Sequence, residues 1–302
     1  RGLGDVYKRQ LSHNKNSVKK LTGEDVQLWE ANFGYSQNTH IIGVNQPLGQ
    51  MYGYVTDGLY QVSDFDYDAA TKTYTLKDGV PYAGEKGNVK PGMWKFKNID
   101  GSKDNKITEA DKTVIGNAYP KIYGGINNTF TYKDFDLSIF LTYSIGNDVF
   151  NATKLTNTKT ALQNKNVLAV ADSKHRWVLV NKAGDLITDP QEMADINKGK
   201  TVAAIYDNEA GDTYIHSWAV EDGSFLKLSN ITLGYTFPKK MIRKVGLSKL
   251  RLYATGSNLL TWTKYSGFDP EVSTMGNGLT PGVDFGAYPR SRSFVFGINL
   301  AF

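Results

Sequence analysis

The sequence of this 302-residue chain predicts an all-β protein with the strands of an antiparallel transmembrane β-barrel and long extracellular loops. Three observations predict this fold: strictly alternating runs of residues, connections of very unequal length, and an alternating aromatic strand at the end of the chain. Barrel strands alternate between lipid-facing and lumen-facing side chains, and a closed barrel satisfies every backbone hydrogen bond inside a bilayer.

A first hairpin surrounds Lys133 and Asp134. In residues 135–143 every odd position is apolar or aromatic, and the even positions are polar except Phe140. Residues 123–132 alternate as well. Because only two residues separate the two runs, they are expected to form a hairpin with a tight turn.

A second hairpin is expected over residues 224–258. The apolar residues of its first strand change parity near Ser229 and Asn230, which a β-bulge would explain. Pro238 ends this strand, and the returning strand begins at Lys249. The turn between them is basic, with Lys239, Lys240, Arg243 and Lys244.

The last strand is expected at residues 292–302. One of its faces is apolar and ends on an aromatic residue, as in the signal that the outer-membrane assembly machinery reads. These candidate assembly-signal residues are Phe294, Phe296, Ile298, Leu300 and Phe302. The alternative is a buried edge strand of a secreted β-sandwich.

The connections differ in length. Residues 146–223 and 259–291 are long and polar, whereas the two hairpin turns are short, which is the asymmetry of an outer-membrane barrel. A soluble sandwich is expected to keep most connections short. Weaker patterns predict one more upward span over Ile41 to Tyr60, the tail of a downward span over Leu11 to Leu21, and a helix within 150–178.

Composition excludes several other classes. Lys and Arg number 35 against 30 Asp and Glu, so the net charge of +5 is scattered and gives no support to nucleic-acid binding. The absence of Cys excludes disulfides and thiolate zinc sites, and the four His are widely spaced. There is no apolar run long enough for a transmembrane helix, which does not exclude strands that cross a membrane.

Residues 1–10 are set apart from the rest. RGLGDVYKRQ resembles a translated adapter scar from sequence assembly, and the chain does not begin with Met. We therefore expect residues 1–10 to be non-native and residues 11–302 to be a truncated fragment whose N-terminal part is missing.

Four motifs resemble the SusC/RagA family of TonB-dependent transporters. They are the whole of residues 89–141, SFLKLSNITLGYTFP at 224–238, the run 250–272 that contains NLLTWTKYSGFDPEV, and YPRSRSFVFGINLAF at 288–302. The resemblance implies a barrel of about 22 strands, of which this chain would supply about seven or eight at ~10 residues each. It also implies the outer membrane of a Gram-negative, Bacteroidetes-like bacterium.

The resemblance implies partners too. A SusD-like surface lipoprotein caps such a barrel. Residues 11–302 would be the C-terminal part of the barrel, and the TonB complex would act through the plug and N-terminal domains, which are absent from it. The expected cargo is an oligosaccharide, a peptide or another nutrient oligomer, and outer-membrane lipid surrounds the wall. No substrate-binding residue is identified. No nucleophile–base pair or phosphate loop is found, so no enzyme activity and no cofactor other than calcium are expected.

Residues 100–111 have the spacing of a twelve-residue calcium loop. Oxygen ligands would come from five side chains and from the carbonyl at position 7. Asn105 replaces the usual turn glycine, and the last ligand is Asp where Glu is usual, which predicts weak binding. The candidate ligands are Asp100, Ser102, Asp104, Lys106, Thr108 and Asp111. The alternative is a polar turn with no ion.

Aromatic residues in or beside the long loops have two interpretations. Trp177, Trp218 and Trp262 would stack on sugar rings or form the girdle at the membrane interface, and the girdle is favoured. Asp269-Pro270-Glu271 is expected to shape a loop. The rival to a barrel segment is a secreted, calcium-stiffened β-sandwich that binds glycans.

Overall fold

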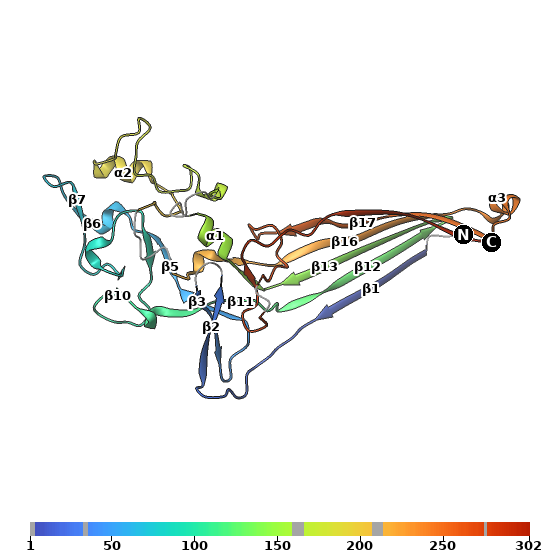
Figure 1. Ribbon diagram of the computed structural model, residues 1–302, viewed down its shortest axis with the longest axis horizontal. Helices are drawn as coiled ribbons and strands as arrows, with labels where there is room; N and C mark the ends of the chain where they lie inside the picture. Colours follow the sequence, from blue (N-terminus) through green and yellow to red (C-terminus); the bar gives the residue numbers. More distant parts are fainter. Residues whose placement is uncertain (1–3, 33–35, 159–165, 207–213, 275–276) are drawn as a thin grey trace.

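Two regions make up the molecule in this computed structural model, an extended six-stranded sheet and a lobe of loops and short elements at one end of it (Figure 1). The structure describes residues 4–32, 36–158, 166–206, 214–274 and 277–302. No helix in these ranges is both long and apolar enough to cross a bilayer.

The six-stranded sheet, called the main sheet below, is antiparallel throughout. Its order is β1-β12-β13-β16-β17-β19. The strands are β1 (Gly4–Ser12), β12 (Ile122–Tyr132), β13 (Phe135–Ile145), β16 (Phe225–Thr236), β17 (Lys249–Thr263) and β19 (Ser293–Ala301). Both predicted hairpins and the predicted final strand are therefore confirmed.

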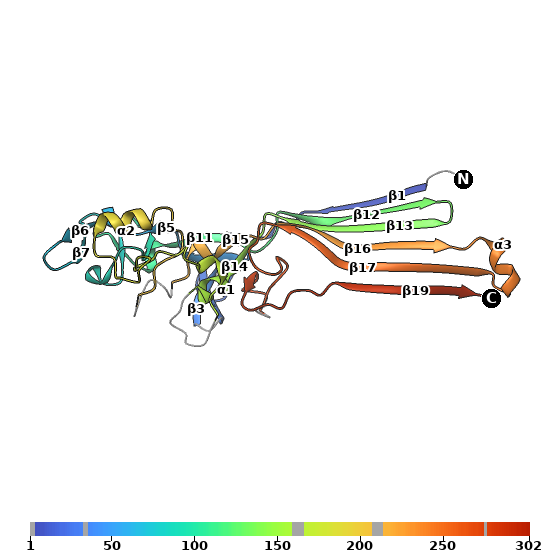
Figure 2. The same cartoon turned by 90° about the horizontal axis from the view of Figure 1, so that it is seen from above.

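The turn at Lys133 has the geometry that a two-residue connection needs. Lys133 adopts a positive φ of 53°, and Tyr132 pairs with Phe135 across the turn. At the same end of the sheet, the connection from β16 to β17 is the short helix α3 (Lys239–Ile242) followed by a 3-10 turn (Arg243–Val245). Short connections thus gather at one end and the long ones at the other (Figures 1 and 2).

A β-bulge lies where the parity of the sequence changes. The register between β13 and β16 shifts between Phe140 and Leu141, and the register between β16 and β17 shifts between Leu228 and Asn230. Because side chains alternate with a period of two, one extra residue at Ser229 returns Leu228 to the face that carries Ile231. The predicted bulge is confirmed, and its effect is to keep one face apolar along the whole strand.

The lobe contains the remaining elements. A four-stranded sheet has the order β11 (Lys112–Asn117), β4 (Gln50–Tyr54), β3 (Ser36–Gly43), β2 (Val26–Asn32). A three-stranded sheet has the order β15 (Val220–Asp222), β14 (Asp148–Asn151), β18 (Val283–Asp284). The paired short strands are β5 (Thr56–Leu59) with β9 (Trp94–Phe96), β6 (Phe65–Asp68) with β7 (Thr73–Leu76), and β8 (Tyr82–Ala83) with β10 (Lys106–Ile107).

Helices are few and short. The described α-helices of the lobe are α1 (Ala152–Asn157) and α2 (Pro190–Ile196). Single 3-10 turns in the lobe are Val62–Asp64, Lys86–Asn88, Glu109–Asp111, Ala169–Ala171 and Ser217–Ala219. Of the helix expected within 150–178, the described part is α1 and the turn at Ala169–Ala171, and residues 159–165 lie outside the described ranges.

Three expectations about the first half of the chain are wrong. Ile41 to Tyr60 is not one span but parts of β3, β4 and β5 in the lobe. The strand expected over Leu11 to Leu21 ends at Ser12. The described residues between 13 and 121 contribute no strand to the main sheet, for which the described ranges supply six strands instead of seven or eight. Residues 4–10 pair with β12 as part of β1, and their proposed origin as an assembly scar stays a prediction.

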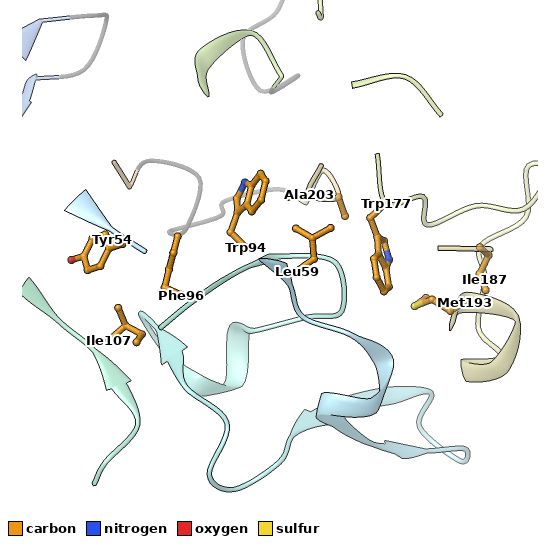
Figure 3. Close-up of a cluster of buried hydrophobic side chains, with 10 residues drawn as sticks. Tyr54, Leu59, Trp94, Phe96, Ile107, Trp177, Ile187, Met193 and Ala203 are labelled. Atoms are coloured by element: carbon orange, nitrogen blue, oxygen red, sulfur yellow. The ribbon is translucent and has the colours of Figure 1, made fainter. Parts of the chain in front are cut away.

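The hydrophobic core lies in the lobe. The largest cluster of buried residues gathers around Trp94, Phe96 and Trp177 (Figure 3). None of the three buried clusters found in the described ranges includes a residue of the main sheet. The main sheet is therefore stabilised by its backbone pairing and side-chain ladders, while its apolar side chains remain on the surface.

Candidate transport surface and loop lobe

The main sheet has one apolar face. The register places Leu137, Leu233, Ala254 and Phe296 in one row across four strands. The next row towards the short turns contains Phe135, Tyr235, Leu252 and Ile298. On β19 the exposed fractions of Phe294, Phe296, Ile298 and Leu300 are 66%, 80%, 64% and 52%. The structure thus brings the candidate assembly-signal residues onto one exposed apolar face, and Phe302 follows directly after that strand.

Aromatic side chains border this face at both ends. At the short-turn end, the rings of Phe135 and Tyr235 are 4.7 Å apart, and those of Tyr235 and Phe237 are 4.9 Å apart. At the lobe end, Tyr143, Leu226 and Trp262 share a row. The two rows are eight residues apart on β13, or ~26 Å at ~3.3 Å per residue before any tilt. This separation is close to the apolar band of about 25 Å in outer-membrane barrels.

The opposite face carries a polar ladder. Arg251 donates two hydrogen bonds to Asp136, and the hydroxyls of Thr232 and Thr255 are 2.9 Å apart. Next to the bulge, the hydroxyls of Thr142 and Ser229 are 2.7 Å apart. Paired polar side chains of this kind suit a surface that meets water, such as the interior of a transporter.

A buried ion pair joins the polar face to the 264–292 loop. Lys227 of β16 is 3% exposed, and its Nζ lies 2.6 Å from Glu271 Oε2. Arg290 adds contacts of 3.2 Å to Glu271 Oε2 and 3.6 Å to Asp269 Oδ2. The expectation that Asp269-Pro270-Glu271 shapes a loop is confirmed, because Glu271 fastens that loop to the sheet and Asp269 accepts from the Glu271 amide within it.

A cavity of about 660 Å³ lies between α1 and the 264–292 loop. Phe268 and Tyr288, which contribute to its lining, are 79% and 90% exposed. Lys154 also lines it, and its Nζ lies 3.0 Å from Glu221 Oε1 and 4.2 Å from the centre of the Trp218 ring. Exposed rings around an apolar cavity are able to stack on a sugar ring or cover an apolar side chain.

Asp284, which lines this cavity, is held by Tyr265. The phenol of Tyr265 donates a 2.5 Å hydrogen bond to Asp284 Oδ2. Burial and then this hydrogen bond raise the pKa of Tyr265 well above its usual range, so the phenol remains a neutral donor.

Two of the three tryptophans lie elsewhere than expected. Trp177 is 2% exposed inside the main cluster of the lobe, so both the girdle and the sugar-stacking interpretations are wrong for it. Trp218 packs between Lys154 and Trp94, with ring centroids 4.8 Å apart in the tryptophan pair. Trp262 is 51% exposed in the row of Tyr143, where the girdle interpretation fits.

Residues 100–111 form a tight turn in the lobe. Asp100 Oδ1 accepts from the Ser102 amide at 2.7 Å, and Asp104 Oδ1 accepts from the Ser102 hydroxyl at 2.8 Å and the Lys106 amide at 3.0 Å. Asn105 adopts a positive φ of 57°, as its place in a calcium loop requires, and Ile107 is buried.

Asp111 differs from its expected role as a ligand. It is fully buried, its Oδ1 accepts from the Ile99 amide at 2.7 Å and its Oδ2 accepts from the Thr108 amide at 2.8 Å. Both oxygens therefore close the turn. Within the described ranges, no group of three or more His, Cys, Asp or Glu is placed to hold a metal, and the calcium site stays a prediction.

Two buried histidines fasten segments of the lobe. His40 Nε2 lies 2.9 Å from the Pro281 carbonyl, and His40 Nδ1 lies 2.9 Å from the Thr39 hydroxyl. Burial lowers the pKa of His40 to about 4, although the bond to Pro281 opposes the shift. His216 Nδ1 lies 2.8 Å from the Thr56 hydroxyl, and its ring packs against Trp94 and Phe96. No pattern in the sequence indicated either residue, because their partners are distant in sequence.

Comparisons with known proteins give one consistent family. No protein-family model matches the chain. TonB-dependent receptor P3 of Formosa agariphila is 30% identical over 299 residues, which cover 97% of this chain and 26% of that receptor. TonB-dependent receptor SusC of Bacteroides thetaiotaomicron is 26% identical over 296 residues, covering 97% of this chain and 24% of SusC.

A solved structure gives the same fold. The RagAB peptide importer in its open–open state matches with a TM-score of 0.65 and 19% identity, covering 99% of this chain and 27% of the matched chain. The chain spans about a quarter of the length of the curated relatives it matches. It belongs to the TonB-dependent receptors of the SusC type.

Proposed function

We propose that this chain forms part of the wall and the outer loops of an outer-membrane transporter that imports nutrient oligomers in a TonB-dependent manner. The two-faced main sheet carries the proposal. Its apolar face continues through the bulge between two aromatic borders, and its other face is a polar ladder. This is the arrangement of a barrel wall between lipid and an aqueous interior.

The wall closes with strands from a longer chain. In the part of the chain that the structure describes, β1 and β19 each pair with one neighbour in the main sheet. An unpaired edge in lipid costs several kcal/mol for each backbone group. The proposed whole is a barrel of about 22 strands, in which β1 and β19 pair with strands outside this chain.

The lobe is the outer, substrate-facing part. The short turns at the other end suit the periplasmic side, because outer-membrane barrels have short periplasmic turns and longer extracellular loops. A SusD-like surface lipoprotein would then cap the lobe, and TonB would act from the periplasmic side. The proposed location is the outer membrane of a Gram-negative, Bacteroidetes-like bacterium. The proposed assembly signal consists of Phe294, Phe296, Ile298, Leu300 and Phe302.

The cargo is proposed to be a glycan or another nutrient oligomer, including a peptide. The relative with the solved structure is named a peptide importer. The cavity beside Phe268 and Tyr288 supports either cargo, because exposed rings pack equally well on sugar rings and on apolar side chains.

The rival function, a secreted glycan-binding β-sandwich, lacks its second layer. In a sandwich the inner faces of two sheets pack together. Here Phe296 and Ile298 of the main sheet remain exposed, and the buried clusters of the described residues lie in the lobe.

Uptake by the full-length transporter tests the proposed function. Cells that carry the parent gene, with or without a working TonB, are given labelled oligosaccharides and labelled peptides in parallel. We expect uptake of one class only, and its loss without TonB. Binding at the surface followed by uptake that is independent of TonB would contradict the proposal.

A further inference from the structure

The turn between β16 and β17 is strongly cationic. Its five cations are all exposed: Lys239, Lys240, Arg243, Lys244 and Lys249. Residues 237–249 contain no Asp or Glu. Among the residues with described positions, no salt bridge involves any of the five. This cluster, called the basic turn below, therefore presents positive charge that no ion pair among those residues neutralises.

The basic turn has a fixed shape. Ile242 is buried, and Gly246 ends the turn with a φ of 76° and an amide that donates to the Arg243 carbonyl. The Ser248 amide donates to the Ala301 carbonyl at 2.8 Å, which joins the turn to β19. The element that carries the cations is thus anchored, and α3 lies at the tip of the main sheet (Figures 1 and 2).

Two large apolar side chains are exposed among these cations. Met241 is 60% exposed and Val245 is 69% exposed, although Ile242 between them is buried. An element that exposes apolar and cationic groups together is typical of segments that lie at a membrane surface.

The position of the basic turn agrees with its composition. Phe237 immediately precedes it, and Phe237, Tyr235 and Phe135 form the aromatic border of the apolar face. Aromatic rings mark the level of the bilayer interface. Lys and Arg just beyond that level meet the lipid phosphates. Each such cation strengthens binding to an anionic membrane surface.

We propose that the basic turn binds anionic phospholipid headgroups in the leaflet at the short-turn end of the barrel. Its cations contact the phosphates, and Met241 and Val245 insert between the lipids. The inference rests on the proposed function, because it requires the main sheet to lie in a bilayer. A soluble acidic partner is disfavoured, because it would not account for two exposed apolar side chains beside the aromatic border.

The test uses the full-length transporter in detergent, titrated separately with phosphatidylglycerol and phosphatidylcholine, with bound lipids counted by native mass spectrometry. The variant K239Q/K240Q/R243Q/K244Q removes four charges from the basic turn. The matched control K15Q/K19Q/K20Q/K121Q removes four exposed charges at the lobe end. A second variant, M241S/V245S, tests insertion of the apolar pair.

We expect the basic-turn variant to lose affinity for phosphatidylglycerol by at least ten-fold and by up to several hundred-fold, because each of the four cations contributes about five-fold and independent contributions multiply. The control should keep its affinity within about two-fold, and M241S/V245S should bind both lipids more weakly. Equal losses of affinity in the variant and the control would overturn the inference. Free phosphate that binds the basic turn as tightly as phosphatidylglycerol does would overturn it as well. Failure of the proposed function can be told apart from failure of this inference. It would appear as an apolar face of the main sheet that is exposed to water and not to lipid.

Discussion

Arg251 on β17 reaches across β16 to Asp136 on β13, with Nε 3.0 Å from Oδ1 and Nη2 2.6 Å from Oδ2. Gly234 of β16 lies beneath this contact, and a Cβ there would overlap both the guanidinium and the carboxylate. One ion pair therefore holds three strands in register on the polar face.

Removing the charge of Asp136 should weaken the sheet. We expect Asp136→Asn to lower the free energy of unfolding of the full-length barrel by roughly 1.5–3 kcal/mol, because two charge-assisted hydrogen bonds are lost. Urea unfolding in detergent measures it. Thr131→Val, an exposed change on the same face, should stay within about 0.5 kcal/mol. Equal effects of the two changes would show that the ion pair contributes nothing.

The two variants that break the ion pair between Lys227 and Glu271 should differ in how much stability they lose. Glu271→Gln leaves the Lys227 ammonium buried, which costs about 3 kcal/mol or more. Lys227→Met leaves Glu271 with Arg290 at 3.2 Å, so its cost should be roughly 1 kcal/mol. Thermal unfolding shows which of the two variants loses more stability. Protease cleavage within 264–292 should be faster in the less stable variant. A more severe effect of Lys227→Met would contradict the account.

The two roles within residues 100–111 are separable. Asp100→Ala with Asp104→Ala should abolish any heat of calcium binding in calorimetry at millimolar calcium, where even weak loops of this type are largely filled. Asp111→Ala should destabilise the lobe with or without calcium, because three backbone amides lose their acceptor. Identical calorimetric heats for the wild type and the double variant would leave only a polar turn.

The stability of the lobe should depend on pH through His40. Its folded pKa of about 4 is below the unfolded value of 6.5, so the contribution is complete above pH 6.5 and is lost as the pH falls towards 4. The full shift corresponds to on the order of 3 kcal/mol. The protection factors of amides near Pro281, corrected for the pH dependence of exchange in an unfolded chain, should therefore fall over this interval. His40→Gln should flatten the dependence, whereas His175→Gln, an exposed control, should leave it intact.

The main sheet could be predicted from the sequence because each strand lies between two different environments. Apolar and polar faces produce a period of two, so the hairpin at Lys133 and the bulge at Ser229 both leave a visible pattern. Even the parity change between Leu228 and Ile231 was informative, since an apolar face has to be continuous.

The lobe could not be predicted in the same way. Its strands are short and several are covered on both sides, so Met51, Tyr54 and Leu59 are buried without a simple alternation. Trp177 was assigned to an interface because of its residue type, but contacts distant in sequence place it in the core. The pairing of Lys227 with Glu271 joins residues 44 positions apart, which neither composition nor spacing reveals.

The measurement that tests the two-faced wall most directly is the environment of spin labels in the full-length protein in lipid vesicles. Labels at Leu137 and Ile298 probe the apolar face, and labels at Ser138 and Thr255 probe the polar face. Gly297 is unsuitable, because a side chain there would overlap Tyr253. We predict that oxygen, which is concentrated in lipid, relaxes the first pair more strongly, and that a water-soluble nickel complex relaxes the second pair. The reverse pattern, or equal access of the nickel complex to all four labels, would contradict a barrel wall.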